Sequence, residues 1–167
     1  MRRWGLAVVT IVGALALPAA VAASSNGDVD LLQVLAGPLA RAEHGKLHVL
    51  VPARLAAGFP SAHLYASGGL SGDGYDIQLG AAPHCADSPA CFVAEFAAAA
   101  KGNLDGADRV SLTKGISARF SPIACGASCS PASIRWREYG ALYTLWFSGT
   151  KSQLVALADG AISAGPR

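Results

Sequence analysis

Residues 133–147 read SIRWREYGALYTLWF, with an apolar-rich run on either side of Tyr139-Gly140. Two such runs around a short turn that contains glycine are the signature of a β-hairpin. Side chains alternate along a strand, so the first run presents two different faces. The apolar face carries Ile134 and Trp136, and the polar face carries Ser133, Arg135 and Arg137. We therefore expect this hairpin to bring its aromatic residues into the core of a sheet.

Further strand-like segments extend this hairpin to a sheet. Alternating or apolar runs bounded by turn residues predict strands at 47–51, 62–67, 75–79, 91–97, 109–112 and 116–120. The glycine-rich stretch Gly68–Gly74 is expected to be the flexible tip of a hairpin. It is not a phosphate-binding loop, because no Gly-Lys-Ser/Thr closes it. The predicted fold class is α+β, with an antiparallel twisted sheet of about six or seven strands.

One helix is predicted before the sheet and one after it. Leucines at helical spacing predict a short N-terminal helix, with Asp28 as its cap and Pro38 as an interruption. Residues Thr150–Gln153 match a capping box, with threonine at the cap and glutamine three residues later. The apolar stripe Leu154–Ile162 continues this C-terminal helix, and Gly165-Pro166 ends it. We expect this helix to pack on one face of the sheet.

The first 22 residues have the pattern of a secretory signal peptide. A short basic start precedes the apolar run Leu6–Ala19, and the small residues that follow fit the small-x-small cleavage rule. We expect cleavage after Ala22 or Ala23, which leaves one α+β domain at 24–167. No stable membrane anchor is expected to remain. The mature protein is then exported, to the periplasm or outside the cell.

The basic balance of the chain comes from this predicted leader. The whole chain has 13 Lys and Arg against 11 Asp and Glu. Without Arg2 and Arg3 the basic and acidic residues are equal in number, so the rest of the chain is electrically balanced. Domains that bind nucleic acid carry a basic excess, and we therefore expect no nucleic-acid partner.

Four cysteines lie in the predicted mature domain. An exported chain with an even number of cysteines favours disulfides, and four cysteines allow three pairings. The two local pairings, Cys85–Cys91 and Cys125–Cys129, are favoured because each closes a short, turn-rich loop. Bridges across such short loops stabilise a fold by only about 1–3 kcal/mol each. We therefore expect them mainly to fix the shape of their loops.

The common catalytic and metal-binding patterns are missing or incomplete. The loop Cys125–Cys129 is one residue too long for a papain-type site, and no Gly-x-Ser-x-Gly elbow occurs. Zinc held by His84, Cys85 and Cys91 would lack a fourth ligand and would need reduced cysteines. Residues 103–108 lack the acidic positions of a calcium loop. We expect no catalytic residue, no metal and no cofactor.

Two groups of charged residues remain as candidates for contact with a ligand. Acidic residues lie at and near the expected hairpin tip, but the sequence cannot place two of them at the separation that glycosidases need. Arginines that alternate along one face of a sheet can meet an anionic ligand. The residues that we expect to contact a ligand or partner are Arg119, Arg135, Arg137 and Asp73.

Two stretches carry a resemblance to a known family. One is Val51–Phe59, VPARLAAGF, and the other runs from Trp136 through Gly140 and Tyr143 to the helix at 154–162. They resemble the two ends of the DUF4367 type, a family of domains of unknown function in exported bacterial proteins. The resemblance spans roughly residues 48–164. It implies an extracytoplasmic domain that binds or senses something, with no catalytic residues to carry over.

The sequence therefore predicts a non-catalytic binding or sensing module of the bacterial cell envelope. Its partner would be an unknown protein or small ligand. We expect the tip Gly68–Gly74 and the two cysteine loops to carry recognition, because loops on a rigid sheet usually do. Two alternatives stay open. One is an envelope-acting hydrolase with an unrecognised site, and the other is a purely structural domain of an envelope assembly.

Overall fold

A computed structural model describes residues 28–55, 64–85 and 90–167 of the chain. The predicted signal peptide, its cleavage site and residues 56–59 of the segment Val51–Phe59 lie outside the described residues. Within the described part, no helix is both long enough and apolar enough to cross a membrane.

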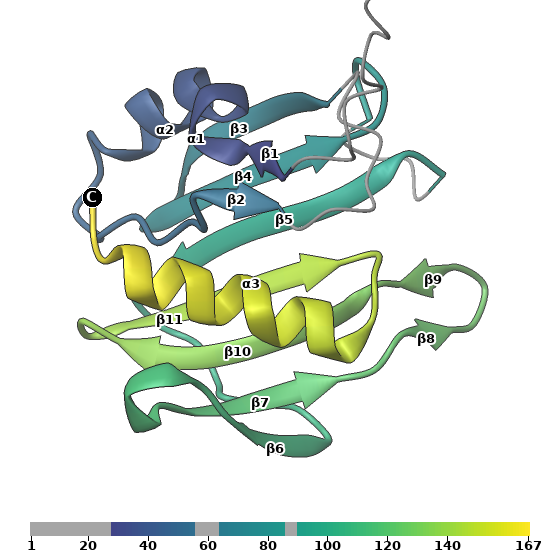
Figure 1. Cartoon of the computed structure of the whole chain (residues 1–167). Helices are drawn as coiled ribbons and strands as arrows, with labels where there is room; N and C mark the ends of the chain where they lie inside the picture. Colours follow the sequence, from purple (N-terminus) through teal and green to yellow (C-terminus); the bar gives the residue numbers. More distant parts are fainter. Residues whose placement is uncertain (1–27, 56–63, 86–89) are drawn as a thin grey trace, which may run out of the picture.

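Seven antiparallel strands form the main sheet, in the order β3-β4-β5-β11-β10-β7-β6 (Figure 1). The predicted α+β class is thereby confirmed, together with the expected number of strands. The hairpin of β10 and β11 lies in the middle of the sheet, where strands are covered best. The strands are β3 (Tyr65–Ser71), β4 (Gly74–Gly80), β5 (Phe92–Ala99), β6 (Asp108–Ser111), β7 (Ser117–Ser121), β10 (Ala132–Glu138) and β11 (Ala141–Phe147).

The central hairpin has the register and the turn that its sequence predicts. The strands pair from Ala132 opposite Phe147 to Glu138 opposite Ala141. Both residues of the turn have a positive φ, 48° at Tyr139 and 76° at Gly140. Turns of this kind match the right-handed twist of the two strands, which explains why a two-residue connection is enough. Trp136 stacks on the opposite strand with its ring centroid 5.5 Å from that of its cross-strand partner, Tyr143.

Helices cover one face of the sheet. The helix α3 (Lys151–Ala164) crosses β10 and β11, and α2 (Ala36–Ala42) packs on β3 and β4 (Figure 1). The short helix α1 (Leu31–Val34) contacts α2. The capping box at Thr150 and Gln153 is present at the start of α3. The buried side of α3 consists of Leu154, Leu157, Ala158, Ala161 and Ile162, as the apolar stripe predicts. Together with the inward side chains of the strands, these residues form a single core.

The N-terminal helix differs from the prediction in its cap and in its interruption. Asp30, rather than Asp28, caps α1, since its carboxylate accepts from the amide N–H groups of Leu32 and Gln33. The helix breaks at Leu35, and Pro38 lies inside the first turn of α2. Proline is tolerated there because the amide groups of a first turn have no partner within the helix.

The predicted strand at 47–51 is wrong. Val49, Leu50 and Val51 are buried, but the backbone bonds of this segment run to the hydroxyls of Tyr75 and Tyr143 and to Arg167 rather than along a neighbouring strand. The only strand of this region is the two-residue β2 (Arg54–Leu55), which pairs with β1 (Val29–Asp30). An apolar run is needed at any segment that is buried between the sheet and the helices, so the apolar pattern of 47–51 does not distinguish such a segment from a strand.

The glycine-rich hairpin tip is also shorter than predicted. Residues Gly68–Ser71 belong to β3, and the turn before β4 consists of Gly72 and Asp73 alone. Gly74 must lack a side chain, because a Cβ there would lie 1.7 Å from the carbonyl oxygen of Ala98 on β5. The glycines therefore permit close packing of strands as well as turning.

The other predicted strands are present with ends shifted by one or a few residues. The turn between β6 and β7 contains the short 3-10 helix Thr113–Gly115.

Both disulfides join local pairs, and these are the pairings that the sequence favours. One links Cys85 to Cys91 and the other links Cys125 to Cys129. The second closes an exposed arm of two short strands, β8 (Ala124–Cys125) and β9 (Cys129–Ser130). Figure 1 shows this arm extending beyond the end of the main sheet.

Candidate functional site

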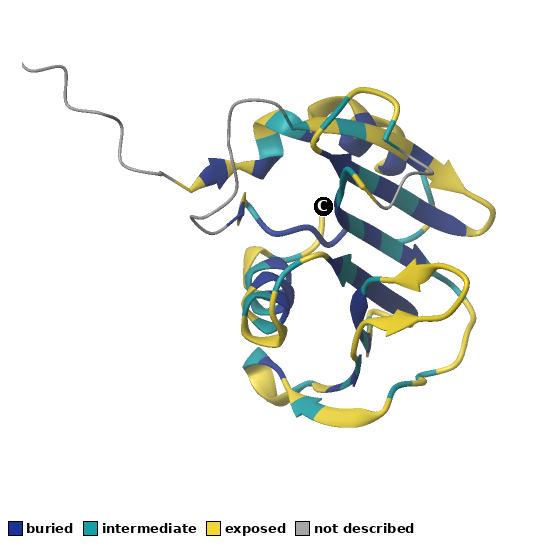
Figure 2. Ribbon diagram, turned by 90° about the vertical axis from the view of Figure 1, so that its right-hand side faces the viewer, coloured by how far each residue is buried: buried dark blue, intermediate teal, exposed yellow. Residues whose placement is uncertain are grey.

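The face of the sheet opposite α3 carries polar side chains from each of the seven strands, and we call it the open face. Along β4 and β5 buried residues alternate with less buried ones, visible as bands in Figure 2. The charges on this face are separated. Its acidic side chains lie on β4 and β5, whereas three arginines stand in one row across β6, β7 and β10: Arg109, Arg119 and Arg135.

A pair of carboxyl groups is the main chemical feature of the open face. Asp76 on β4 pairs with Ala97, two residues from Glu95 on β5, so the two acidic side chains are diagonal neighbours. Their carboxyl groups share a hydrogen bond. Gln78, directly opposite Glu95, donates from Nε2 to its Oε2 at 3.5 Å.

Both carboxyl groups hold their protons more tightly than usual. Burial, with the nearby charge of Asp76, raises the pKa of Glu95 to about 7. Burial also raises the pKa of Asp76, although the hydrogen bond from Glu95 opposes this shift. These shifts indicate that below about pH 7 Glu95 keeps a proton and donates it to the Asp76 carboxylate.

Neither carboxylate has a cationic partner among the described residues. The three ion pairs of that part of the chain are Arg54–Asp28, Arg135–Asp105 and Lys151–Asp108. Buried or half-buried charges are usually paired, because removing them from water costs free energy. The acidic pair therefore keeps an electrostatic attraction for a positive charge that no described residue satisfies.

The pair lies in a hollow of about 330 Å³ on the open face, which we call the acidic hollow. Small side chains, such as those of Ala97 and Ala99, line the hollow and leave space between the larger residues around it. Trp146 on β11 stands directly opposite Glu95, and Asp73 from the β3–β4 turn lies at the rim. Its lining residues include Asp73, Asp76, Glu95, Ala97, Thr144 and Trp146. Carboxylates and an aromatic ring thus face one small space.

The arginines predicted as ligand contacts are brought together, but their contacts lie within the chain. Arg137 donates from Nη2 to the carbonyl oxygen of Gly102, and Nη1 of Arg135 lies 4.0 Å from the Asp105 carboxylate. Gly106 packs on Arg119 so closely that a Cβ would lie 2.7 Å from the Arg119 Cβ. These arginines therefore hold the connection between β5 and β6 against the open face. Their contact with a ligand stays a prediction.

The cysteine loops offer no thiol and no metal ligand set. All four cysteines are oxidised, so zinc at His84, Cys85 and Cys91 has lost its two sulfur ligands. In the described ranges no group of three or more His, Cys, Asp or Glu is arranged to hold a metal ion.

Of the four residues predicted to contact a ligand, Asp73 is the one that lines the acidic hollow.

Comparison with protein-family models, with curated proteins and with solved structures finds no match to this chain. The resemblance at Val51–Phe59 and around Trp136 stays a prediction.

The sequence alone did not identify the acidic pair. Alternation at 91–97 places Glu95 and Ala97 on one face of a strand, and this signal was available. The neighbours of Glu95 on that face are set by the order and register of β4, β5 and β11, which are non-local. No spacing in the sequence relates Asp76 and Trp146 to Glu95.

Proposed function

We propose that this protein is a non-catalytic binding module of an oxidising compartment outside the cytoplasm, and that the acidic hollow receives a cationic group of its ligand. The observation that carries the proposal is a half-buried, hydrogen-bonded carboxyl pair without a basic partner among the described residues, opposite an aromatic ring. Two disulfides support the compartment, since they persist where thiols are not kept reduced.

The chemistry of the hollow favours an ammonium or guanidinium group. Two carboxylates supply charge and hydrogen-bond acceptors for such a group. The face of Trp146 can attract the same cation, and a cation–π contact contributes about 0.5–2 kcal/mol depending on burial. A cation that enters the hollow displaces the proton of Glu95. Binding is therefore expected to strengthen as the pH rises through about 7, the pKa of Glu95.

The test compares butylammonium with 1-butanol, a neutral molecule of similar shape. We expect the amine to shift the NMR signal of the Trp146 indole N–H and to bind more tightly at pH 8 than at pH 6. Glu95→Gln should weaken amine binding by about tenfold or more, which corresponds to about 1.4 kcal/mol. Glu43→Gln makes the same change at an exposed residue, the C-terminal cap of α2, and serves as the matched control. Equal binding of amine and alcohol would reject the proposal.

A hydrolase is the second candidate, and the same carboxyl pair is the observation that favours it. Two carboxyl groups that share a proton can activate a water molecule, as in aspartic proteases. They are too close for the glycosidase arrangements, which need about 5 Å or more between them. Cleavage of a peptide library by the protein, abolished by both Asp76→Asn and Glu95→Gln, would replace the binding proposal with this one.

A further inference from the structure

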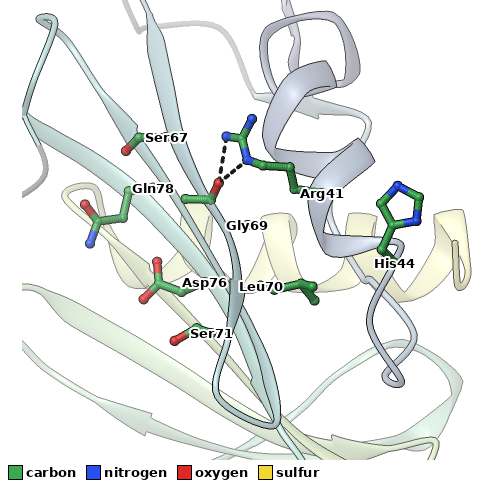
Figure 3. Close-up of a pocket in the computed structure, with 9 residues that line it drawn as sticks. Arg41, His44, Ser67, Gly69, Leu70, Ser71, Asp76 and Gln78 are labelled. Carbon is green, nitrogen blue, oxygen red and sulfur yellow. Dashed lines mark hydrogen bonds between the residues drawn. The ribbon is translucent and has the colours of Figure 1, made fainter.

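A second hollow, of about 720 Å³, runs along the edge of β3 that no described strand covers, and we call it the edge trough. Figure 3 shows its two walls on opposite sides of the strand. Arg41 and His44 stand on the side of α2, whereas Ser67, Asp76 and Gln78 stand on the side of the open face. Between the walls, the bare backbone of Gly68 and Gly69 forms the floor.

The edge formed by β3 is far less protected than the opposite edge. Proteins protect sheet edges with short strands, charged residues and prolines. The strand β6 is four residues long and carries Asp108 and Arg109, and the ammonium group of Lys151 lies 2.8 Å from the Asp108 carboxylate. In contrast, β3 is seven residues long, YASGGLS, and holds neither a charge nor a proline. Two of its residues are large and exposed: Tyr65 (41%) and Leu70 (54%).

The contact of Arg41 shows that the edge can accept an outside donor. Its Nε and Nη2 donate to the carbonyl oxygen of Gly68 at 2.9 and 2.7 Å. That carbonyl therefore points away from β4. The glycines make room for this contact, because a Cβ on Gly69 would lie 2.9 Å from the Arg41 Cβ. Backbone groups on the free side of an edge strand are the groups that an added strand uses.

We propose that the edge trough receives an extended strand of a partner polypeptide, with acidic side chains toward Arg41 and His44 and basic side chains toward Asp76. Successive side chains of a strand point to opposite faces, so one added strand meets both walls at once. The walls carry opposite charge, which selects for alternation of acidic and basic residues. Leu70 lies beside Gly45 on the Arg41 side, and an apolar residue among the acidic ones fits there.

A second copy of β3 is a poor occupant of the same trough. Two β3 strands paired with each other would bring no charged residue to either wall, since β3 contains none. The partner must therefore be a different segment with alternating charge. This proposal does not require that the acidic hollow binds a cation, although both sites use the Asp76 carboxyl group.

The test uses two end-capped heptapeptides of the same composition and the purified full chain. In Glu-Lys-Val-Thr-Glu-Lys-Val the acidic and basic residues fall on opposite faces of a strand. In Glu-Thr-Lys-Val-Glu-Val-Lys all charges fall on one face. We expect the first to bind at least tenfold more tightly by titration calorimetry, and to slow hydrogen exchange of amides in 65–71. Equal affinities, no binding, or unchanged exchange in 65–71 would overturn the proposal.

Two matched variants separate this site from the acidic hollow. Leu70→Lys places a charge on the edge, and Ile123→Lys makes the same change at another exposed residue, on the approach to the disulfide arm. We expect at least a tenfold loss of peptide binding with Leu70→Lys and none with Ile123→Lys, while butylammonium binding is unchanged in both. A dimer of the chain alone that Leu70→Lys dissociates would identify a second copy as the occupant and overturn the proposal.

Discussion

The amide N–H and the carbonyl oxygen of Leu50 both bond to the hydroxyl of Tyr75, at 3.0 and 3.1 Å. Each residue is 2% exposed, so water cannot replace these bonds. Segment 47–51 lacks the ladder of bonds that a strand would have, and its buried backbone groups need other partners. The Tyr75 hydroxyl on β4 and the Tyr143 hydroxyl on β11, which donates to the His48 carbonyl oxygen at 3.0 Å, therefore fix this segment to the covered face of the sheet.

Removal of that hydroxyl should destabilise the protein. Tyr75→Phe leaves two buried backbone groups of Leu50 without bonds, and we expect a loss of about 1–3 kcal/mol in the free energy of unfolding. Urea denaturation followed by tryptophan fluorescence measures it. Tyr65→Phe makes the same chemical change at an exposed site, where we expect a change within about 0.5 kcal/mol. Similar losses in both variants would contradict the role of the Tyr75–Leu50 bonds.

The acidic pair should make stability depend on pH. The pKa of Glu95 rises from 4.5 to about 7 on folding, so between these values the folded chain holds a proton that the unfolded chain has lost. Its contribution to stability is therefore present at low pH and lost as the pH rises through this window. We expect Glu95→Gln to flatten the fall in unfolding free energy between pH 4.5 and 7, and to be more stable than the parent at pH 8.

The matched control for this prediction is Glu43→Gln, at the exposed C-terminal cap of α2. It should keep the pH profile of the parent. A Glu95→Gln profile that follows the parent over the same window would show that the carboxyl pair does not form.

Arg137 should be needed to hold the connection between β5 and β6. Arg137→Ala removes the donor to the Gly102 carbonyl oxygen, and we expect faster hydrogen exchange in 101–107 with a loss of about 1 kcal/mol. Arg109→Ala, an exposed arginine on the edge strand β6, is the control. If Arg137→Ala instead leaves hydrogen exchange in 101–107 unchanged and weakens the binding of a ligand to the open face, the arginines belong to the binding site.

The two disulfides should differ in their importance. Cys85 packs against β4, where a Cβ on Gly80 would lie 2.4 Å from the Cys85 Cβ. The backbone carbonyl oxygen of its partner Cys91 accepts a hydrogen bond from the amide N–H of Ala81. The Cys125–Cys129 bridge lies in a fully exposed arm. We expect replacement of Cys85 and Cys91 by serine to cost about 2 kcal/mol. The same replacement in the arm should change global stability by less than about 0.5 kcal/mol, because the arm can open alone.

Calorimetry of both double variants, with the reduced parent as reference, checks this difference. An equal loss of stability in the two variants would show that the exposed arm is part of the cooperative fold.

Local signals predicted much of the framework correctly. The turn at Tyr139-Gly140 and the capping box at Thr150 both depend on residues within a few positions of one another, and both are present in the structure. Asp30 caps α1 two residues after the predicted cap, Asp28, and because both side chains offer the same carboxylate their chemistry does not select between them. Local chemistry identifies a type of element better than its end.

By itself, the sequence determined the alternation of faces in each strand, the capped C-terminal helix and the short disulfide loops, since these follow from covalent geometry and neighbouring side chains. The tertiary structure alone decided which strands are neighbours. It therefore decided that Asp76 and Glu95 share a proton opposite Trp146, and that β3 rather than β10 is an edge. The physical reason is that strand order depends on burial of the whole core, which no local pattern records.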